Sequence, residues 1–148
     1  MDKYAGIISL YLDSVNLFSE IEKKPRNYGT NELIYNSEID TLVLIGDAKG
    51  INLTQLALGL GISKSGTSRF VKKLIEKTLI TKDRKEGNAK EVVFTLTKKG
   101  KVAYKSKNEF NKKLYSSLYG TVSRYVEDDL NRISEFLTET NDEMSKIV

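Results

Sequence analysis

The sequence has neither cysteine nor histidine among its 148 residues. Without cysteine, disulfides and thiolate nucleophiles are excluded. Without histidine, a Ser-His-Asp triad and a histidine general base are excluded as well. The Cys/His cage that holds most zinc ions is missing for the same reason. We therefore expect a protein that is not an enzyme and that binds no metal and no cofactor.

Long apolar runs are also missing. The longest stretches, around Ile7 to Leu12 and Leu42 to Ile45, are far too short to cross a bilayer. The start of the chain, Met1 to Ala5, lacks the basic segment and the apolar run of a signal peptide. These features predict a cytoplasmic protein that makes no contact with a membrane.

The chain has enough apolar sequence for one core. Hydrophobic residues make up 39% and charged residues 30%, over a length that suits a single domain. The one proline, Pro25, lies in a segment typical of a turn or loop. No internal repeat or long linker divides the sequence, so we treat residues 1–148 as one domain.

Apolar residues recur every three or four positions at both ends of the chain, which predicts amphipathic helices there. The first helix should cover most of the first two dozen residues. From Thr97 onward the pattern is helical again, with an interruption near Gly120. The apolar positions of these end helices are Tyr4, Ile7, Ile8, Tyr11, Val15, Phe18 and Ile21, and then Val122, Val126, Leu130, Ile133 and Leu137.

The middle of the chain predicts shorter elements. A helix should begin near Ser37, a good N-cap, run to about Lys49 and be ended by Gly50. Two further helices are expected on either side of Gly61, followed by two strands with Gly87-Asn88 at their turn. The expected bounds are Leu53 to Leu60 with Asn52 or Thr54 as cap, Ser63 to about Lys77 with Ser63 as cap, Leu79 to Arg84, and Lys90 to Leu96.

The two helices around Gly61 have the spacing of a helix-turn-helix, in which a glycine allows the corner to adopt a positive φ. Thr67 occupies an inward position of the second helix, where its hydroxyl needs a partner such as a carbonyl one turn back. The helical step then turns a basic, hydroxyl-rich face outward. The inward apolar residues are Leu56, Ala57, Leu60, Ile62, Phe70, Val71 and Leu74, and the outward residues are Ser65, Ser68, Arg69, Lys72 and Lys73.

This outward face has two interpretations. It suits the major groove of DNA, because hydroxyls and arginine reach base edges and a helix N-terminus attracts phosphate. It is equally typical of a solvated polar surface. The hairpin favours DNA, because basic residues surround its tip and a basic wing can follow the minor groove or the backbone. Those basic residues are Lys82, Arg84, Lys85 and Lys90.

The distribution of charge supports the same interpretation. Residues 63–101 carry 12 basic and four acidic residues, a net charge of +8. The rest of the chain carries 12 basic and 16 acidic residues, a net charge of −4, so the total is only +4. Binding to phosphates requires basic charge concentrated on one segment in this way.

These segments together resemble the MarR family of winged helix-turn-helix transcriptional regulators. The resemblance rests on LTQLALGLGISKSGTSRFVKKLIEKTLI, on the hairpin, and on the run Leu96-Thr97-Lys98-Lys99-Gly100 that opens a long helix. It implies a mainly α fold with a small β-hairpin wing. In the family, the second helix of the motif (the recognition helix) and the wing bind double-stranded DNA, while the first and last helices build a homodimer.

The resemblance also implies a division of the chain. Residues 36–100 would form the winged helix-turn-helix DNA-binding lobe, and residues 1–24 and 101–148 the helical dimerisation region. The expected function is that of a sequence-specific regulator, more in keeping with a repressor, which binds a pseudo-palindromic operator as a homodimer. The expected DNA-binding residues are Ser63, Lys64, Ser65, Thr67, Ser68, Arg69, Lys72, Lys73, Arg84, Lys85 and Lys90.

The wing departs from the family pattern. Family wings commonly carry Asp-Arg-Arg shortly before the Leu-Thr pair, and here those positions hold Asn88, Ala89 and Lys90. Only Lys90 keeps a charge there, and it lacks the fork of arginine. Arg84 or Lys85 from the other strand are alternatives for the residue that enters the minor groove.

Many family members release DNA when a small ligand enters the cleft between the dimer helices and the DNA-binding lobe. Others sense peroxide through cysteine or bind zinc, which this composition excludes or disfavours. A ligand pocket here would draw on tyrosines of the end helices, although the sequence favours their packing in the dimer instead. These residues are Tyr11, Tyr104, Tyr115 and Tyr119.

Two alternatives come from other classes. Gly61 to Ser68 is similar to a phosphate-binding P-loop, but Thr67 stands where that loop needs lysine, so nucleotide hydrolysis is disfavoured. The stronger alternative is a dimeric winged-helix module that binds protein without specific DNA binding. DNA affinity that falls steeply with salt distinguishes a DNA-binding protein from this module.

Overall fold

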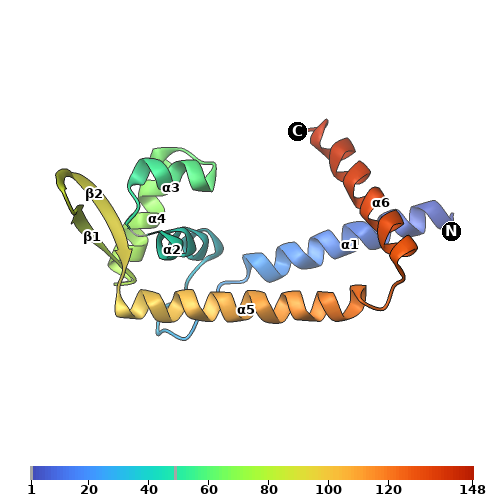
Figure 1. Cartoon of the computed structure of the whole chain (residues 1–148), viewed down its shortest axis with the longest axis horizontal. Helices are drawn as coiled ribbons and strands as arrows, with labels where there is room; N and C mark the ends of the chain where they lie inside the picture. The colour runs from blue at the N-terminus through green and yellow to red at the C-terminus, as the bar shows by residue number, and fades with distance from the viewer. Residues whose placement is uncertain (1, 49) are drawn as a thin grey trace. The chain divides into compact units, whose positions relative to one another are not determined.

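The computed structural model of the chain describes residues 2–48 and 50–148. It contains two compact units, Met1–Asn108 and Glu109–Val148. The first unit holds a helix-turn-helix and a two-stranded hairpin, together with the helices that precede and follow them (Figure 1). Its elements are α1 (Lys3–Lys23), α2 (Asn36–Asp47), α3 (Leu53–Leu60), α4 (Lys64–Glu76), β1 (Ile80–Lys85), β2 (Asn88–Leu96) and the first part of α5 (Lys98–Val122).

The helix-turn-helix forms from strong local signals. The Asn52 side chain accepts a hydrogen bond from the Gln55 N–H at 2.9 Å and caps α3. Gly61 ends α3 in the left-handed conformation, with φ of 66°, which a residue without a Cβ adopts at little cost. Ser63 then caps α4 by accepting from the Gly66 N–H at 3.2 Å. Asn52 rather than Thr54 is therefore the cap of α3, and the expected cap of α4 is confirmed.

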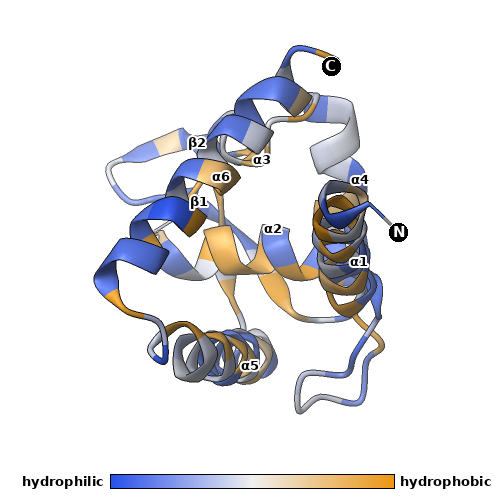
Figure 2. Cartoon of the chain, turned by 90° about the vertical axis from the view of Figure 1, so that its right-hand side faces the viewer, coloured by the Kyte–Doolittle hydropathy of each residue, from blue (hydrophilic) through white to orange (hydrophobic). Residues whose placement is uncertain are grey.

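The core of the first unit lies between α2, the helix-turn-helix and the hairpin. Figure 2 shows how strongly hydrophobic residues are concentrated on α2. Thr67 is fully buried in this core, and its hydroxyl donates to the Ser63 carbonyl at 3.0 Å, as expected. The apolar residues of the core include Ile34, Ile39, Leu42, Ile45, Leu56, Val71, Leu74, Leu79, Ile80 and Phe94.

The hairpin is an antiparallel pair in which Ile80 lies opposite Leu96 and Lys82 opposite Phe94. Its turn consists of Glu86 and Gly87, and Asn88 already belongs to β2, so the expected turn at Gly87-Asn88 is shifted by one residue. The Phe94 N–H donates to the Ile51 carbonyl at 2.9 Å, which fastens β2 to the segment before α3.

The junction from β2 to α5 explains the Leu-Thr-Lys-Lys-Gly run. The Thr97 hydroxyl donates to the Thr78 carbonyl at 2.7 Å and accepts from the Gly100 N–H at 3.0 Å, so it both caps α5 and connects it to the turn before β1. A Cβ on Gly100 would overlap the Leu79 carbonyl oxygen. The run therefore serves the fold, and its glycine is required by close packing.

Two expected features of α2 are wrong, namely Ser37 as its N-cap and Gly50 as the residue that ends it. Helix α2 begins at Asn36 rather than after a Ser37 cap, because the Glu38 carboxylate accepts from the Tyr35 N–H at 3.1 Å and starts the helix earlier. It ends at Asp47, with Ala48 in an extended conformation. The expected end at Lys49 lies outside the described residues, and Gly50, with φ of 86°, comes after the helix has ended.

The second unit consists of the C-terminal part of α5 and of α6 (Glu127–Ser145). The interruption between the two helices falls at residues 123–126, close to Gly120 as expected, although Gly120 itself lies inside α5. Glycine alone did not end the helix here. Instead Val126 precedes three acidic residues, Glu127, Asp128 and Asp129, which suit the first turn of a new helix.

Helices α1 and α6 contain no buried residue. In α1, for example, Ile7 and Ile8 are each 55% exposed. The expected fold, a winged helix-turn-helix with helices before and after it in the sequence, is confirmed. Among residues 2–48 and 50–148, no helix combines the length and the apolar character that crossing a bilayer requires.

Candidate nucleic-acid interface

The outward face of α4 is built as the sequence predicts. Thr67, Val71 and Leu74 are its buried residues, so the helical step directs Ser65 and Arg69 to the opposite side, where both are exposed. Lys64 lies in the first turn and is exposed as well. This face presents hydroxyl and guanidinium donors next to a helix N-terminus, a combination that can bind base edges and phosphates.

Two residues of the expected set have structural roles. Thr67 is fully buried with its hydroxyl engaged, so its assignment as a DNA contact is wrong. The residue that fills the inward position cannot also reach a ligand on the other side of the helix. Ser63 is exposed, but its hydroxyl caps α4 and lies 3.1 Å from the Ser65 hydroxyl.

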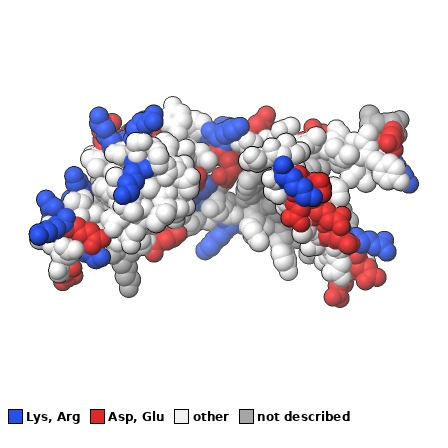
Figure 3. Space-filling view, turned by 90° about the horizontal axis from the view of Figure 1, so that it is seen from above, with Lys and Arg blue, Asp and Glu red and all other residues white. Residues whose placement is uncertain are grey.

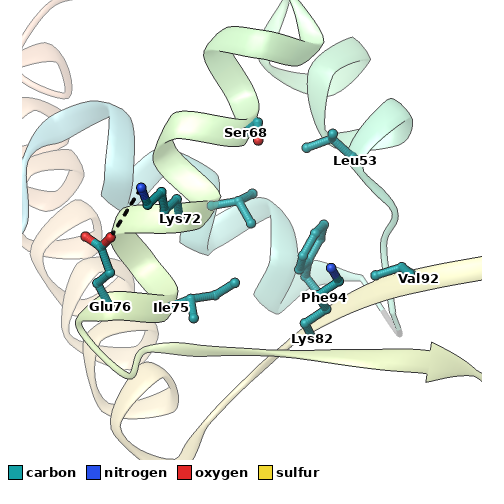
Figure 4. A pocket seen from close by; sticks show the side chains of 9 residues that line it. Leu53, Ser68, Lys72, Ile75, Glu76, Lys82, Val92 and Phe94 are labelled. Atoms are coloured by element: carbon teal, nitrogen blue, oxygen red, sulfur yellow. Dashed lines mark ion pairs between the residues drawn. The ribbon is translucent and has the colours of Figure 1, made fainter.

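A groove of about 630 Å³ separates α4 from the hairpin (Figure 4). Ser68 and Lys72 of α4 line one side of it, and Lys82 of β1 lines the other. Lys72 forms an exposed ion pair with Glu76, at 3.9 Å. The remaining lining is apolar and consists of Leu53, Val71, Ile75, Val92 and Phe94. The groove therefore has an apolar floor and lysines on both walls.

The wing residues are exposed but are not equivalent. Arg84, Lys85 and Lys90 all lie on the surface of the hairpin. Lys85 forms an ion pair with Glu91 at 3.0 Å, and Glu91 in turn accepts from the Asn52 amide at 2.8 Å. The hydrogen bond from Asn52 has the largest effect on the carboxylate of Glu91, and the contact with Lys85 has the next largest. Together they lower the pKa of Glu91 from its usual value of 4.5. Asn52 thus joins the wing to the cap of α3.

Lys73 lies on the flank of α4 that faces α2, where sequence reasoning missed a partner. Its ammonium is 3.8 Å from the Glu38 carboxylate, which is buried. The position of Glu38 three residues after Tyr35 was an available signal, because a glutamate at that spacing often caps a helix start. The ion pair with α4 had no signal in the sequence, since the residues are distant along the chain.

Another charged cluster lies where α1, α2 and α5 meet within the first unit. Lys107 is buried, and its ammonium is 3.4 Å from the Glu22 carboxylate. Burial raises the pKa of Asp40 above its usual 3.8, against the opposing effect of Lys107 and with a further upward effect of Glu22. No group of three or more potential metal ligands occurs among the residues that the structure describes.

The tyrosines considered for a ligand pocket are not brought together as a set. In the first unit, the Tyr104 hydroxyl donates to the Asp47 carboxylate at 2.5 Å, which raises the pKa of Tyr104. Its ring packs so closely on Gly46 that a Cβ there would overlap it. Tyr11, on α1, is half-buried. Tyr115 and Tyr119 belong to the second unit and are largely exposed.

The basic side chains gather on the hairpin and the adjoining helix-turn-helix. Figure 3 shows lysine and arginine side chains clustered at the tip of the hairpin, at the left edge of that view. Acidic residues are also present there, because Glu86 and Glu91 belong to the same hairpin. The hairpin and α4 thus combine exposed cations, exposed hydroxyls and an apolar groove.

Comparisons with known proteins point to one family. Residues 34–92 match the MarR family. An uncharacterized HTH-type transcriptional regulator of Bacillus subtilis (strain 168), YhjH, is 26% identical over 129 residues, which cover 87% of this chain and 71% of that protein.

Solved structures show the same fold. Lactococcus lactis ZitR in complex with DNA superposes with a TM-score of 0.75 at 22% identity, covering 97% of this chain and 99% of that one. Streptococcus pneumoniae FabT in complex with DNA gives a TM-score of 0.72 at 20% identity, with the same coverage of both chains. The resemblance inferred from the sequence is therefore confirmed.

Proposed function

The chain belongs to the MarR family through its residues 34–92, and we propose that it is a sequence-specific, DNA-binding transcriptional regulator. The observation that carries this proposal is the exposed face of α4, where Ser65 and Arg69 lie opposite the buried Thr67. Side chains on such a face can enter a major groove without disturbing the core. The DNA complexes of ZitR and FabT, which share the fold, support the same proposal.

The proposed roles follow from position and chemistry. Ser65, Ser68 and Arg69 would contact base edges, because short hydroxyls and guanidinium donors can read them. Lys64 and Lys72 would bind phosphates. Lys82, on the opposite wall of the groove from Lys72, would bind the backbone that runs between α4 and the wing. The wing residues Arg84, Lys85 and Lys90 would reach the adjacent minor groove or its phosphates.

We further propose that the regulator acts in the cytoplasm as a homodimer on a pseudo-palindromic operator. Two copies related by a twofold axis place two recognition helices about one turn of DNA apart. No residue of α1 is buried, and its exposed apolar residues, such as Ile7, Ile8 and Phe18, support a partner helix there. Repression, with release by a small ligand, is the form of regulation that the family resemblance favours.

The test begins with selection of bound fragments from random or genomic DNA, followed by gel-shift titration of variants on the selected site. Arg69→Ala should cost about 1–3 kcal/mol of binding free energy and relax specificity at one base pair. Lys72→Ala should weaken binding to all sequences alike and reduce the salt slope by about two units, one for each protomer of the proposed homodimer. An Arg69→Ala protein that binds like the wild type would refute the assignment of Arg69 to base reading.

The alternative function, a protein-binding winged-helix module, has a different outcome. Such a module would enrich no DNA sequence in the selection, and its partner would not compete with duplex DNA. The apolar groove beside Lys72 and Lys82 is the feature that favours it, because protein-binding surfaces often have apolar centres with charged rims.

A further inference from the structure

Glu38 is a buried carboxylate whose two oxygens differ in the hydrogen bonds that they accept. Only 1% of the residue is exposed. Its Oε2 accepts from the Lys77 ammonium at 2.6 Å and from the Tyr35 N–H at 3.1 Å. Its Oε1 is buried and has no hydrogen-bond partner among the described residues; Lys73 lies 3.8 Å away. A buried carboxylate oxygen in this position attracts any cation within reach.

Lys77 is fixed in place by more than this one contact. Its ammonium also donates to the Leu33 carbonyl at 2.7 Å and lies 5.4 Å from the centre of the Tyr35 ring. Only 20% of its side chain is exposed. Lys77 is the C-cap of α4, so these bonds fasten the end of the recognition helix to the segment that begins α2. Lys77 has no freedom to reach a ligand.

Lys73 differs from Lys77 because its side chain is exposed to solvent although it pairs with Glu38. Its side chain is 56% exposed, whereas the Glu38 side chain is 2% exposed. The ion pair Lys72–Glu76 on the same helix has nearly the same length, 3.9 Å against 3.8 Å, but both of its members are largely exposed. Water and salt screen the Lys72 pair strongly and the Lys73 pair much less, since one member of the latter is buried.

We propose that Glu38 is a positioning residue that holds Lys73 against the protein and limits its use as a phosphate contact, while fixing the end of α4 through Lys77. This inference rests on the proposed DNA-binding function. Lys72 and Lys73 are neighbours of the same type on one helix, yet Lys72 gives up only a well-screened surface ion pair when it binds phosphate, whereas Lys73 gives up a contact with a buried carboxylate. Phosphate has to compete with Glu38 for Lys73, and this competition lowers sequence-independent affinity.

The test compares the salt dependence of duplex binding among matched variants. Lys72→Ala should reduce the slope of log K against log salt by about two units, one for each protomer of the proposed homodimer. Lys73→Ala should reduce it by clearly less than that. Glu38→Gln, which keeps the shape of the side chain and removes its charge, should release Lys73 and steepen the slope by up to about two units. Adding Lys73→Ala to Glu38→Gln should abolish that increase.

Glu76→Gln is the matched control, because it removes one negative charge from the same helix at an exposed position. It should steepen the slope less than Glu38→Gln. Equal effects of Lys72→Ala and Lys73→Ala, or of Glu38→Gln and Glu76→Gln, would overturn the proposal while leaving DNA binding intact. Absence of duplex binding in the wild type would instead overturn the proposed function.

A second measurement does not depend on DNA. A double-mutant cycle of Glu38→Gln and Lys73→Ala, followed by chemical denaturation, measures the coupling of the two side chains. The proposal predicts a favourable coupling that persists as salt is raised, unlike that of Lys72 with Glu76. A coupling indistinguishable from zero would show that Glu38 does not hold Lys73.

Discussion

Two glycines of α5 show how one residue type can have opposite effects in one helix. Gly100 lies in the first turn, where a Cβ would overlap the Leu79 carbonyl oxygen, itself bonded to the Thr97 N–H and hydroxyl. Gly120 lies in the C-terminal part of the same helix, where a Cβ would have no atom within 4 Å beyond its own helix backbone and chain neighbours. Only the first glycine is needed for packing.

Alanine substitutions at these positions should therefore change stability in opposite directions. Gly100→Ala should destabilise the protein by about 1–3 kcal/mol, as expected for overpacking against backbone. Gly120→Ala should stabilise it by about 0.5–1 kcal/mol, because alanine favours the helix. Urea denaturation of the two variants measures both effects. A stabilising Gly100→Ala would contradict the close approach of α5 to Leu79.

At the same scale, single residues explain where sequence reasoning failed. The sequence places Thr67 both in the core and among the DNA contacts. The two roles are incompatible, because a side chain that points into the core cannot also reach DNA on the outer face of the helix. Glu38 went unnoticed because its partners Lys73 and Lys77 lie in another helix. Periodicity reports which face of a helix is buried, but it carries no information on which distant side chain meets it.

At the scale of elements, the wing depends on a chain of polar contacts. Asn52, which caps α3, donates to Glu91 of β2, and Glu91 pairs with Lys85 of β1. The helix-turn-helix and the hairpin are therefore linked by side chains as well as by the Phe94–Ile51 backbone bond. A loss of the charge of Glu91 should therefore weaken the contacts that hold the wing against the helix-turn-helix.

This link gives a pH dependence with a definite sign. The pKa of Glu91 is lowered in the folded protein, so its contribution to stability is fully present above the unfolded pKa, near 4.5, and is lost as pH falls through the folded value. Glu91→Gln should thus be less stable than the wild type at neutral pH, and the difference should vanish in acid. Denaturation midpoints measured from pH 7 to pH 3 test this. A difference that grows in acid would contradict the assignment.

The bounds of helices and strands are predicted well where local capping and turn residues set them. They are predicted less well where contacts between distant residues set them. The caps Asn52 and Ser63 and the corner at Gly61 follow from side-chain chemistry, and α3 and α4 have nearly the expected bounds. The break before α6 lies near Gly120 as expected, but the helix continues through that glycine to Val122. The start of α2 was misplaced because the Glu38 carboxylate, rather than a serine, satisfies the first backbone donor.

At the scale of the whole molecule, α1 leaves an apolar stripe without cover. None of its residues is buried, and Ile7, Ile8 and Phe18 are each at least half exposed. Exposed apolar residues at helical spacing favour association with a second helix. The proposed homodimer accounts for this stripe.

The corresponding prediction concerns assembly. The wild type should sediment as a dimer, and Ile8→Glu should shift it toward monomer, because a charge within the stripe cannot be buried without a partner. Asn16→Glu, on the polar side of the same helix, is the matched control and should leave the dimer intact. Analytical ultracentrifugation distinguishes the two. A monomeric wild type, or an Ile8→Glu variant that remains dimeric, would contradict a dimer built through α1.

The concentration of basic charge is a whole-molecule property that total charge conceals. The net charge of +4 combines +8 over residues 63–101 with −4 over the rest of the chain. The structure brings the positive segment together as α4, the hairpin and the start of α5, all within the first unit. The central claim is that this surface binds DNA and that α4 reads its sequence.

The most direct measurement is the affinity of the wild type for a selected duplex and for a scrambled duplex over a range of salt concentrations. We expect tighter binding to the selected duplex at every salt concentration. We also expect a loss of roughly 10³- to 10⁵-fold between about 50 and 200 mM salt if the dimer neutralises about six to ten phosphates. Affinity that does not respond to salt, or equal affinity for both duplexes, would contradict it.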